Sequence, residues 1–442
     1  MVTDYIVAIY LGTSHLVGMV GKKNSRGALS IVAEEVKESS GCIRRGRIHN
    51  VAETAARIKR LVLELQNKLP NLRIEKVYIG IGGQSLRSID HSEVRTIRAD
   101  AFVSEEDIQL LNEQCKSYRP EMSDVLAIAP PVYYLDDKRT SNPVGVSCRR
   151  IEARYKLVVG QPIIRKSIIN SIEQQAGITV AGIIVSPLAL AEAILTRNEK
   201  ELGCAVIDFG AGVTSIVVYK NGYLAYLGVI PLGSDLITRD LTSLRLVESE
   251  AERLKITYGN AKPNENQEGS ISLDTVDGIG TVVEARAKEI VQNVYARIEE
   301  NKLTNALGAG IVLVGGGASL KNLQELIRDT FKLQEVRYSA IRKGLVDDAS
   351  DKVSDPRYMS ALSLLLQGTE SCVGPIRRKQ EEPAPAPPVQ PVEPVKEPEP
   401  EPERIEPERD REEEQRQNRR TQKRGGIFGS FGRIARGLFD EE

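Results

Sequence analysis

The chain has 442 residues, a length that suits two to four domains, and its formal net charge of −1 argues against a general nucleic-acid binder. Its five cysteines are scattered and form no C-x-x-C pair, which predicts reduced thiols and neither a disulfide framework nor a zinc site. No apolar run is long enough to span a bilayer. The first residues lead directly into an apolar strand, so we expect no signal peptide.

The first recognisable unit is a pair of strands joined by a short turn. Residues 5–11 (YIVAIYL) form an apolar strand, Gly12, Thr13 and Ser14 form the turn, and residues 15–21 continue as a second strand. Residues 28–36 predict a third strand. Apolar residues then recur at helical spacing between residues 48 and 69, which predicts an amphipathic helix closed by Pro70.

A strand at residues 76–81 ends in Gly82-Gly83, a pattern that invites a dinucleotide-binding interpretation. We reject it because the third glycine is missing and no helix follows. Short strands then alternate with polar turns from residue 84 to residue 161, and Ser104 provides a helix-capping signal. This segment is predicted to be a small inserted α+β unit. Helix is predicted again at residues 162–176 and 188–195.

The central stretch of the chain, residues 202–222, reads LGCAVIDFGAGVTSIVVYKNG. An apolar strand ends at Asp208, a glycine turn follows, and a second apolar strand begins after it, which predicts a β-hairpin. The turn residues are Gly210, Ala211, Gly212, Val213 and Thr214. Glycines there allow backbone N–H groups to approach a phosphate closely, and Asp208 is placed to act on a metal or a water beside it. On this segment alone, an ordinary hairpin is an equally good interpretation.

The second half of the chain supplies a third glycine-rich segment. Residues 311–314 form an apolar strand, Gly315, Gly316 and Gly317 follow, and a helical pattern begins at Ser319, an arrangement suited to a nucleotide. Upstream, Glu252 and Lys255 lie three residues apart on a predicted helix. Such a pair is more often a solvated salt bridge, and the alternative is contact with a ribose and a base. Residues 260–278 look loop-rich, and helices are predicted at 281–302 and 358–367.

The composition changes after residue 374. Proline and glutamate dominate residues 381–414, which predicts an extended, disordered acidic linker, and a run of basic residues follows. In residues 425–442 an apolar stripe appears at helical spacing, although a core helix is the usual alternative for such a stripe. The residues predicted to bind a membrane are Ile427, Phe428, Phe431, Ile434, Leu438 and Phe439.

These pieces together resemble the FtsA family, the actin-like cell division proteins of bacteria. The resemblance is carried by IDFGAGVTSIVVYKNG, by SEAERLKITYG, by NPVGVSCRRIEARYKLV at the end of the insert, and by the linker with its terminal amphipathic segment. One departure is Tyr10, which stands at the end of the first strand where the family carries Asp or Glu.

The resemblance implies an α/β fold of two actin-like ATPase lobes around ATP and Mg2+, with a small α+β subdomain inserted in lobe one. It implies that Gly12 to Ser14 and Gly210 to Thr214 hold phosphates, that Asp208 serves the metal, that Glu252 and Lys255 hold the ribose and base, and that Gly315 to Gly317 hold the adenosine. It also implies filaments of the protein itself, attachment to anionic lipids on the cytoplasmic face of the plasma membrane, and binding of the C-terminal tail of the tubulin-like protein FtsZ and of later division proteins. Nucleic acid is not an expected partner.

The expected domains follow from these assignments. They are the lobe-one core (1–83 and 162–201), the insert (84–161), the lobe-two core (202–235 and 307–374), an upper lobe-two subdomain (236–306), a linker (375–424) and a membrane helix (425–442). The expected function is to anchor a division ring, with at most slow ATPase activity because of Tyr10. The alternative is a small-molecule kinase of the same superfamily, which would need a substrate cleft with a catalytic base and no membrane tail.

Overall fold

A computed structural model describes residues 5–375 except 26, 40, 99, 263–272 and 348–350, and it describes only the backbone of residues 273–277. The chain divides into two compact units, Met1–Arg378 and Lys379–Glu442, and every described residue belongs to the first. The predicted linker beyond Pro375 and the predicted membrane helix, residues 425–442, lie outside the described residues.

The first sheet is built around the hairpin predicted at the start of the chain. Strands β1 and β2 pair antiparallel, whereas β7 and β13 run parallel to β1, in the order β13-β7-β1-β2-β3. The strands are β1 (Tyr5–Leu11), β2 (His15–Lys23), β3 (Leu29–Glu38), β7 (Lys76–Ile81) and β13 (Thr179–Val185). Most of β1 and β2 is buried, as their uninterrupted apolar sequence predicts.

Helix α1 (Val51–Asn67) covers one face of this sheet, packing on β2 and β3. The Asn50 side chain caps it by accepting a hydrogen bond from the Glu53 N–H at 3.0 Å. Its buried apolar residues, Ala55, Ile58, Leu61, Val62 and Leu65, belong to the predicted apolar face, and Thr54 is buried beside them. The helix begins three residues later than residue 48 because Ile48 pairs with Ile43 in a small β-ladder.

The second sheet is built around the central hairpin, which is confirmed. Strands β14 and β15 pair antiparallel with Asp208 opposite Ser215, and β17 runs parallel to β14. The strands of this part of the sheet are β14 (Cys204–Phe209), β15 (Thr214–Lys220), β16 (Tyr223–Ile230), β17 (Ile311–Val314) and β18 (Val336–Tyr338). The carboxyl ends of β14 and β17 therefore lie side by side, which brings Asp208 next to the glycines that follow Val314.

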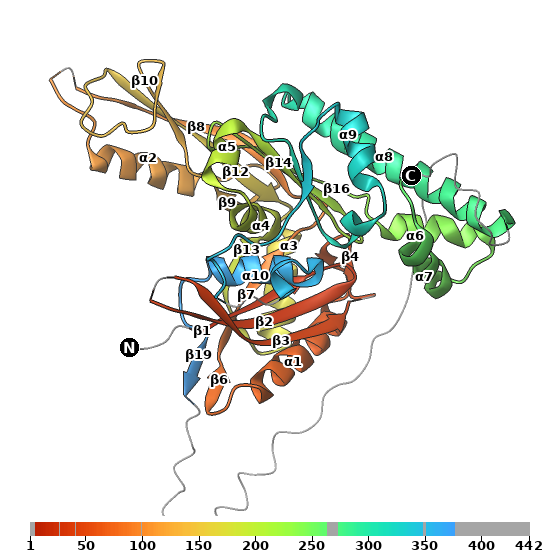
Figure 1. The fold of residues 1–442 in the computed structure, drawn as a ribbon. Coiled ribbons are helices and arrows are strands. Elements are labelled where there is room, and N and C mark those ends of the chain that lie inside the picture. Colours follow the sequence, from red (N-terminus) through yellow and green to blue (C-terminus); the bar gives the residue numbers. More distant parts are fainter. Residues whose placement is uncertain are drawn as a thin grey trace, which may run out of the picture. The chain divides into compact units, whose positions relative to one another are not determined.

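The predicted insert has a core of its own, and its strands extend the second sheet in the order β11-β10-β12-β8-β16 (Figure 1). Strand β12 pairs along its length with β8, and α2 packs on β8. The elements are β8 (Arg87–Thr96), α2 (Glu105–Ser117), β9 (Asp124–Ile128), β10 (Val132–Leu135), β11 (Lys138–Thr140) and β12 (Arg150–Gly160). Ser104 caps α2 with a capping box to Asp107, as its sequence position predicts. The insert joins the second sheet through one pair, Arg87 and Gly228.

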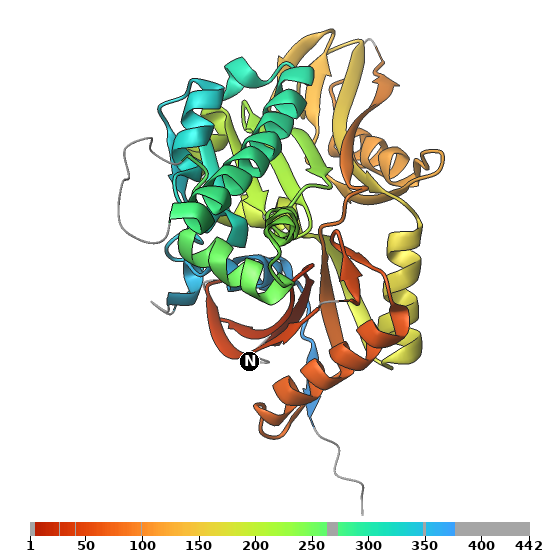
Figure 2. The ribbon, with the colours of Figure 1, turned by 90° about the vertical axis from the view of Figure 1, so that its right-hand side faces the viewer.

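Helices cover the second sheet, and α8 runs across the face formed by β15 and β16 (Figure 2). Helices α8 (Leu273–Glu300) and α9 (Leu323–Phe331) pack on strands of this sheet, whereas α6 (Asp235–Leu241) and α7 (Glu248–Tyr258) pack on each other and on α8. The prediction that residues 273–278 form a loop is wrong. Ile279 is 1% exposed and packs with Val283, so the apolar stripe of α8 continues upstream of residue 281 and Gly278 is tolerated inside the helix.

Two helices, α4 (Ser186–Ile194) and α10 (Pro356–Gln367), connect the two sheets (Figure 1). Helix α10 packs on β1, β2, β7 and α4, while α4 packs on β15 of the second sheet. Their buried residues belong to one core cluster that contains side chains from both sheets. Side chains that lie between the two sheets are therefore positioned by α10 as well as by the two hairpins.

Shorter elements complete the fold. They are β4 (Ile43–Arg44), β5 (Arg47–Ile48), β6 (Leu72–Ile74), α3 (Ile163–Ile168) with its π-helical continuation (Ile169–Gln175), α5 (Arg197–Leu202), β19 (Val373–Pro375), and single 3-10 turns at Thr242–Leu244, Thr304–Ala306, Gly316–Ser319 and Asp351–Val353. All five cysteines are buried and free. Among the described helices, none combines the length and the apolar character that crossing a membrane requires.

Candidate functional site

The turns of the two predicted hairpins are in contact. A Cβ atom added to Gly212 would lie 2.6 Å from the Thr13 hydroxyl oxygen, closer than any side chain tolerates. In the first turn the Gly12 N–H donates to the His15 carbonyl at 3.1 Å, and in the second the Gly210 N–H donates to the Val213 carbonyl at 3.0 Å. The absence of a side chain at residue 212 is thus what allows the two turns to meet.

Backbone donors are left over at both turns. Within the described part of the chain, the N–H groups of Thr13, Ser14, Ala211 and Gly212 donate no hydrogen bond. The carbonyls of the second turn are engaged, because Gly210 and Ala211 accept from the N–H groups of Ser234 and Asp235 at the start of α6. Backbone N–H groups gathered in this way form an anion-binding concavity.

The third glycine segment joins the site through Asp208. Gly315 has a φ of 87°, and a Cβ atom there would lie 2.3 Å from the Asp208 Oδ1. Both the backbone conformation and the close approach of the carboxylate therefore require glycine at residue 315. Gly316 and Gly317 follow it into a 3-10 turn, and the helix predicted from Ser319 begins instead at Leu323, as α9.

A cavity of about 600 Å³ opens where these segments meet. The predicted site residues that line it are Gly12, Thr13, Ser14, Asp208, Gly210, Ala211, Glu252, Lys255, Gly315, Gly316 and Gly317. Gly212, Val213 and Thr214 do not line it. Thr214 is fully buried and its hydroxyl donates to the Leu232 carbonyl at 2.7 Å, so this hydroxyl stabilises the hairpin and is not directed at a ligand.

Glu252 and Lys255 form the ion pair that their spacing suggests, and both also line the cavity. Lys255 is 8% exposed, and its ammonium donates to the Glu252 carboxylate at 2.7 Å, to the Thr238 hydroxyl at 2.9 Å and to the Ser234 carbonyl at 3.3 Å. The Thr238 hydroxyl donates to the same carboxylate oxygen. A salt bridge and contact with a ligand are therefore compatible for this pair, because the salt bridge forms part of the cavity wall.

Asp208 and Tyr10 lie in an environment that disfavours charge. Burial raises the pKa of the Asp208 carboxyl to about 6. Burial also raises the pKa of the Tyr10 phenol, and the nearby Asp208 carboxylate raises it further, while a hydrogen bond with Ser360 acts in the opposite direction. The phenol of Tyr10 is therefore neutral at physiological pH and is able to donate a hydrogen bond.

Several cavity residues were missed by the sequence interpretation. They are His15, Val17, Ser234, Asp235, Ile237, Ile256, Thr257, Tyr258, Gly259, Asn260, Ser319, Leu320, Lys321, Pro356, Arg357 and Ser360. Some of them adjoin predicted segments, so wider windows around the motifs would have included them. The residues of α10 carry no local signal, because only the packing of α10 between the sheets brings them to the cavity.

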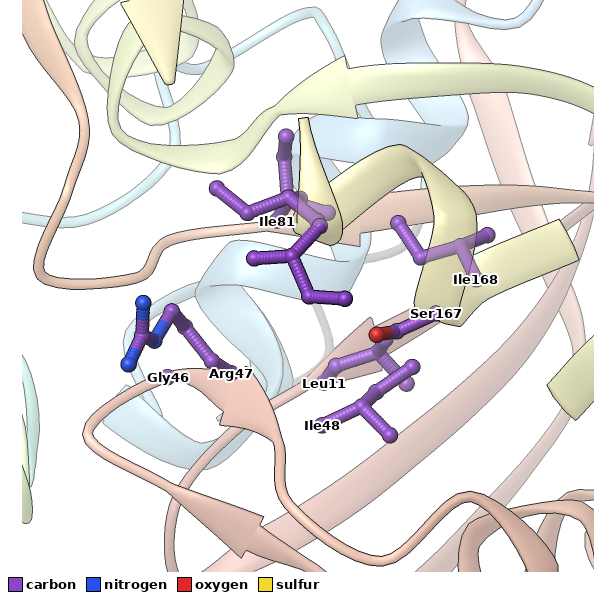
Figure 3. A pocket seen from close by; sticks show the side chains of 9 residues that line it. Leu11, Gly46, Arg47, Ile48, Ile81, Ser167 and Ile168 are labelled. Atoms are coloured by element: carbon purple, nitrogen blue, oxygen red, sulfur yellow. The ribbon is translucent and has the colours of Figure 1, made fainter. Parts of the chain in front are cut away.

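A smaller cavity of about 110 Å³ lies on the lobe-one side of the first turn (Figure 3). Its lining is mainly aliphatic: Leu11, Gly46, Arg47, Ile48, Ile81, Ile163, Ile164, Ser167 and Ile168. The Arg47 guanidinium donates to the Gln161 side-chain oxygen at 2.6 Å, and the Gly46 N–H donates to the Thr13 hydroxyl at 3.0 Å. The hairpin of β4 and β5 thereby supports the first turn from behind.

Two family models match this chain. The model described as cell division protein FtsA matches residues 205–363, and the model described as the SHS2 domain inserted in FtsA matches residues 83–159. The second match overlaps the insert predicted at residues 84–161. The first contains the central hairpin, α7 and the third glycine segment.

Similar proteins are found in several bacteria. Cell division protein FtsA of Porphyromonas gingivalis is 33% identical over 390 residues, which cover 84% of this chain and 80% of that protein. Cell division protein FtsA of Neisseria meningitidis serogroup B is 31% identical over 378 residues, which cover 82% of this chain and 89% of that protein. Among solved structures, the PilM-PilN type IV pilus biogenesis complex matches with a TM-score of 0.61 at 18% identity, covering 83% of this chain and 98% of that chain, a likeness of fold.

Proposed function

The chain belongs to the FtsA family of cell division proteins, and from this premise we propose that it is an ATP-binding filament protein that anchors the tubulin-like division ring to the membrane. As a member of this family it is a cell division protein with an actin-like ATPase fold. Family membership favours this function over a small-molecule kinase.

The observation that supports ATP binding most directly is the set of unpaired backbone donors at the two turns. The N–H groups of Thr13, Ser14 and Ala211, residues that line the cavity, can hold phosphate oxygens. A cavity of about 600 Å³ lies within the size range of ligand pockets. Glu252 and Lys255 then face the ribose and base, and the glycines 315–317 face the adenosine.

Beside the glycine turns the cavity offers Mg2+ one protein carboxylate, so phosphate and water oxygens would supply most of the ligands of the ion. Among the described residues, no group of three or more His, Cys, Asp or Glu side chains converges on one point. Asp208 is the carboxylate beside the glycine turns and the one candidate for the cation shell. Mg2+ therefore enters, in this proposal, as part of the Mg–ATP complex, where it neutralises charge on the phosphates.

The membrane and partner assignments extend the same proposal. Residues 425–442 bind anionic lipids on the cytoplasmic face of the plasma membrane through the apolar residues of their stripe. Copies of the chain assemble into filaments, lobe two binds the C-terminal tail of FtsZ, and later division proteins join the assembly. Family membership supports these assignments, and any ATP hydrolysis is slow.

A Gly210→Val variant is expected to bind ATP at least tenfold more weakly than the parent. A Cβ atom at residue 210 would lie 2.9 Å from the Val213 carbonyl oxygen, so the turn must open and its N–H groups lose their shared orientation. Isothermal titration calorimetry with ATP measures the change. The matched control is Gly278→Ala, because a Cβ atom at residue 278 meets only Leu244 at 3.7 Å and should leave affinity unchanged. Equal affinity of the parent and Gly210→Val would remove the phosphate assignment.

The FtsZ-tail site is expected in lobe two between residues 238 and 304 and at residues 321–331, which include α9, and charge reversal tests it. Arg245 and Lys288 are exposed and form no ion pair within the described residues, whereas Arg286 is paired with Asp240 and Glu289. Reversing both unpaired charges, as Arg245→Glu with Lys288→Glu, should change the affinity for an FtsZ tail peptide by about threefold or more without loss of fold. Fluorescence anisotropy measures the affinity, and Lys138→Glu on the insert is the control. Unchanged affinity in the double variant would argue against this location.

A further inference from the structure

We propose that the hairpin of β4 and β5, together with helix α3, forms a docking site for an acidic peptide segment of a partner protein. The segment inserts one aliphatic side chain into the smaller cavity, of about 110 Å³, and its carboxylates meet Arg44, Arg45 and Arg47. These three arginines and Gly46 make up the hairpin tip. None of the three lines the larger cavity, so the site is separate from the nucleotide site and goes beyond the proposed function.

The smaller cavity suits a single aliphatic side chain. Its walls come mainly from the hairpin and from α3, which contributes three isoleucines. One of them, Ile163, is 51% exposed, so this wall is open to solvent. In Figure 3 the Arg47 guanidinium lies to one side of the aliphatic residues Leu11 and Ile48. Because a cavity of about 150 Å³ holds a benzene ring, one of about 110 Å³ can hold the side chain of leucine, isoleucine or valine.

The hairpin tip carries positive charge without a negative counterpart. Arg44 and Arg47 are direct cross-strand partners, and like charges at such positions destabilise a β-ladder. Within the described residues Arg44, Arg45 and Arg47 form no ion pair, and the Arg47 guanidinium donates to the neutral side chain of Gln161. No acidic residue lines the cavity. The charge at this position is therefore available to an anionic partner.

The backbone of the hairpin tip holds a second unfavourable feature. Arg45 has a φ of 48° and Gly46 has a φ of 68°, so both residues of the turn are left-handed. Asparagine, aspartate and glycine are favoured at the first position of such a turn, whereas an arginine there carries a steric cost. Strain of this kind is often found at functional sites. Contact with an anionic group would account for both the strained arginine and the like-charged pair beside it.

The hairpin tip is fixed in place by close backbone packing. A Cβ atom on Gly46 would lie 2.6 Å from the Gly82 carbonyl oxygen, and a Cβ atom on Gly83 would lie 2.5 Å from the Arg47 Cγ. The glycine pair at residues 82 and 83, which does not fit a dinucleotide site, thus makes room for the hairpin. A site that is formed before binding loses less conformational entropy when a partner docks.

An acidic peptide fits these features better than other anionic partners do. Its carboxylates can form bidentate ion pairs with arginine while a neighbouring side chain fills the cavity. The phosphate backbone of a nucleic acid has no aliphatic group to insert. An anionic lipid surface keeps its acyl chains beneath its headgroups, so its apolar and charged parts do not lie side by side. Lys166 on α3 is exposed and unpaired within the described part of the chain, and it adds to the positive rim.

The test measures binding of a fluorescein-labelled peptide, Glu-Asp-Glu-Leu-Glu-Asp-Glu, to the full-length protein without nucleotide or lipid, by fluorescence anisotropy. The same peptide with alanine in place of leucine should bind at least about fivefold more weakly, because the cavity stays empty. Arg44→Glu with Arg47→Glu should weaken binding of the leucine peptide at least about tenfold. The matched control is Lys116→Glu with Lys138→Glu, which reverses two exposed charges on the insert and should leave the affinity unchanged.

Two further variants separate the cavity from the charges. Ser167→Met fills the cavity, and Ile163→Ser removes apolar surface at its exposed rim. Each should reduce the preference for the leucine peptide over the alanine peptide to about twofold or less, because the inserted side chain loses its apolar contacts. Circular dichroism verifies that both variants are folded, and Ile163→Ser substitutes a half-exposed side chain that the fold does not require.

Three results would overturn the inference. They are equal binding of the leucine and alanine peptides, an affinity that the arginine reversals leave unchanged, and no saturable binding of the leucine peptide at millimolar concentration. If peptide binding is absent but the reversals alter sedimentation of the protein or its binding to anionic vesicles, the hairpin tip contacts a second copy or lipid and the peptide assignment is wrong. None of these results depends on ATP, so the proposed nucleotide site is tested separately.

Discussion

An Asp208→Asn variant is expected to be more stable than the parent by about 2 kcal/mol at pH 7 and by no more than about 0.5 kcal/mol at pH 4. The pKa of the Asp208 carboxyl is raised by burial to about 6, from an ordinary value of 3.8. One pKa unit corresponds to about 1.4 kcal/mol, and the amide that replaces the carboxylate retains part of the cost of burying a polar group.

The direction of this pH dependence follows from proton binding. Between pH 4 and pH 6 the folded protein keeps a proton on Asp208 that the unfolded chain has released, so the free energy of unfolding falls as the pH rises. Below about pH 3, roughly one unit under the ordinary pKa of 3.8, both states are protonated and Asp208 costs nothing. Above it the full penalty persists, and replacing Asp208 removes that penalty.

Urea unfolding of the nucleotide-free protein in EDTA, followed by circular dichroism, measures the effect. The difference between variant and parent at each pH isolates this one group from the other titrating carboxylates. Asp90→Asn is a suitable control, because the Asp90 side chain is 85% exposed and its ion pair with Lys156 lies on the surface. A stability gain in Asp208→Asn that is the same at pH 4 and pH 7 would show that ionisation of Asp208 does not destabilise the folded protein.

The parts of the site that sequence predicts are those with a local pattern. The central hairpin was predicted from two apolar runs around a glycine turn, and its observed register puts Asp208 opposite Ser215, next to that turn. The glycines 315–317 were predicted from a strand that runs directly into them. In each case the residues that define the feature are adjacent in the chain, so one short window contains the whole signal.

The parts that sequence does not predict depend on packing between distant segments. Ser360 is at hydrogen-bonding distance of Tyr10 only because α10 packs on β1, 350 residues away in the chain. Thr214 was predicted to face a phosphate, yet its hydroxyl donates to Leu232 because the start of β15 is fully buried. The two-lobed actin-like fold with its insert is confirmed, but which side chains complete the cavity is decided by tertiary structure.

Deletion of residues 425–442 is expected to reduce binding to anionic vesicles at least hundredfold, which would be the largest effect of any change considered. These residues lie outside the described part of the chain, so sequence alone carries the argument. At about 100° per residue, the apolar residues of the stripe fall on one side of a helix, and Arg433, Arg436 and Asp440 fall on the other. Half of the six phenylalanines of the chain lie here. The segment is too short to span a bilayer and suits its surface.

A single substitution tests whether the apolar stripe carries the binding. Phe431→Asp places a charge in the middle of the stripe and should release the protein from anionic vesicles in a sedimentation assay, while calorimetry shows unchanged ATP binding. Phe431→Leu is the matched control and should retain most of the binding, because it keeps an apolar side chain. Undiminished vesicle binding after the deletion would show that the anchor lies elsewhere.

The glycines of this segment make its folding depend on lipid. Gly429, Gly432 and Gly437 each lower helix propensity by up to ~1 kcal/mol relative to alanine, so the isolated peptide should be largely unfolded in water. The basic residues upstream, Arg419, Arg420, Lys423 and Arg424, each add on the order of 1 kcal/mol of attraction to an anionic surface. Circular dichroism of the peptide 416–442 should therefore show helix with anionic vesicles and little with neutral ones. A peptide that is equally helical in water would show that its helix forms without lipid.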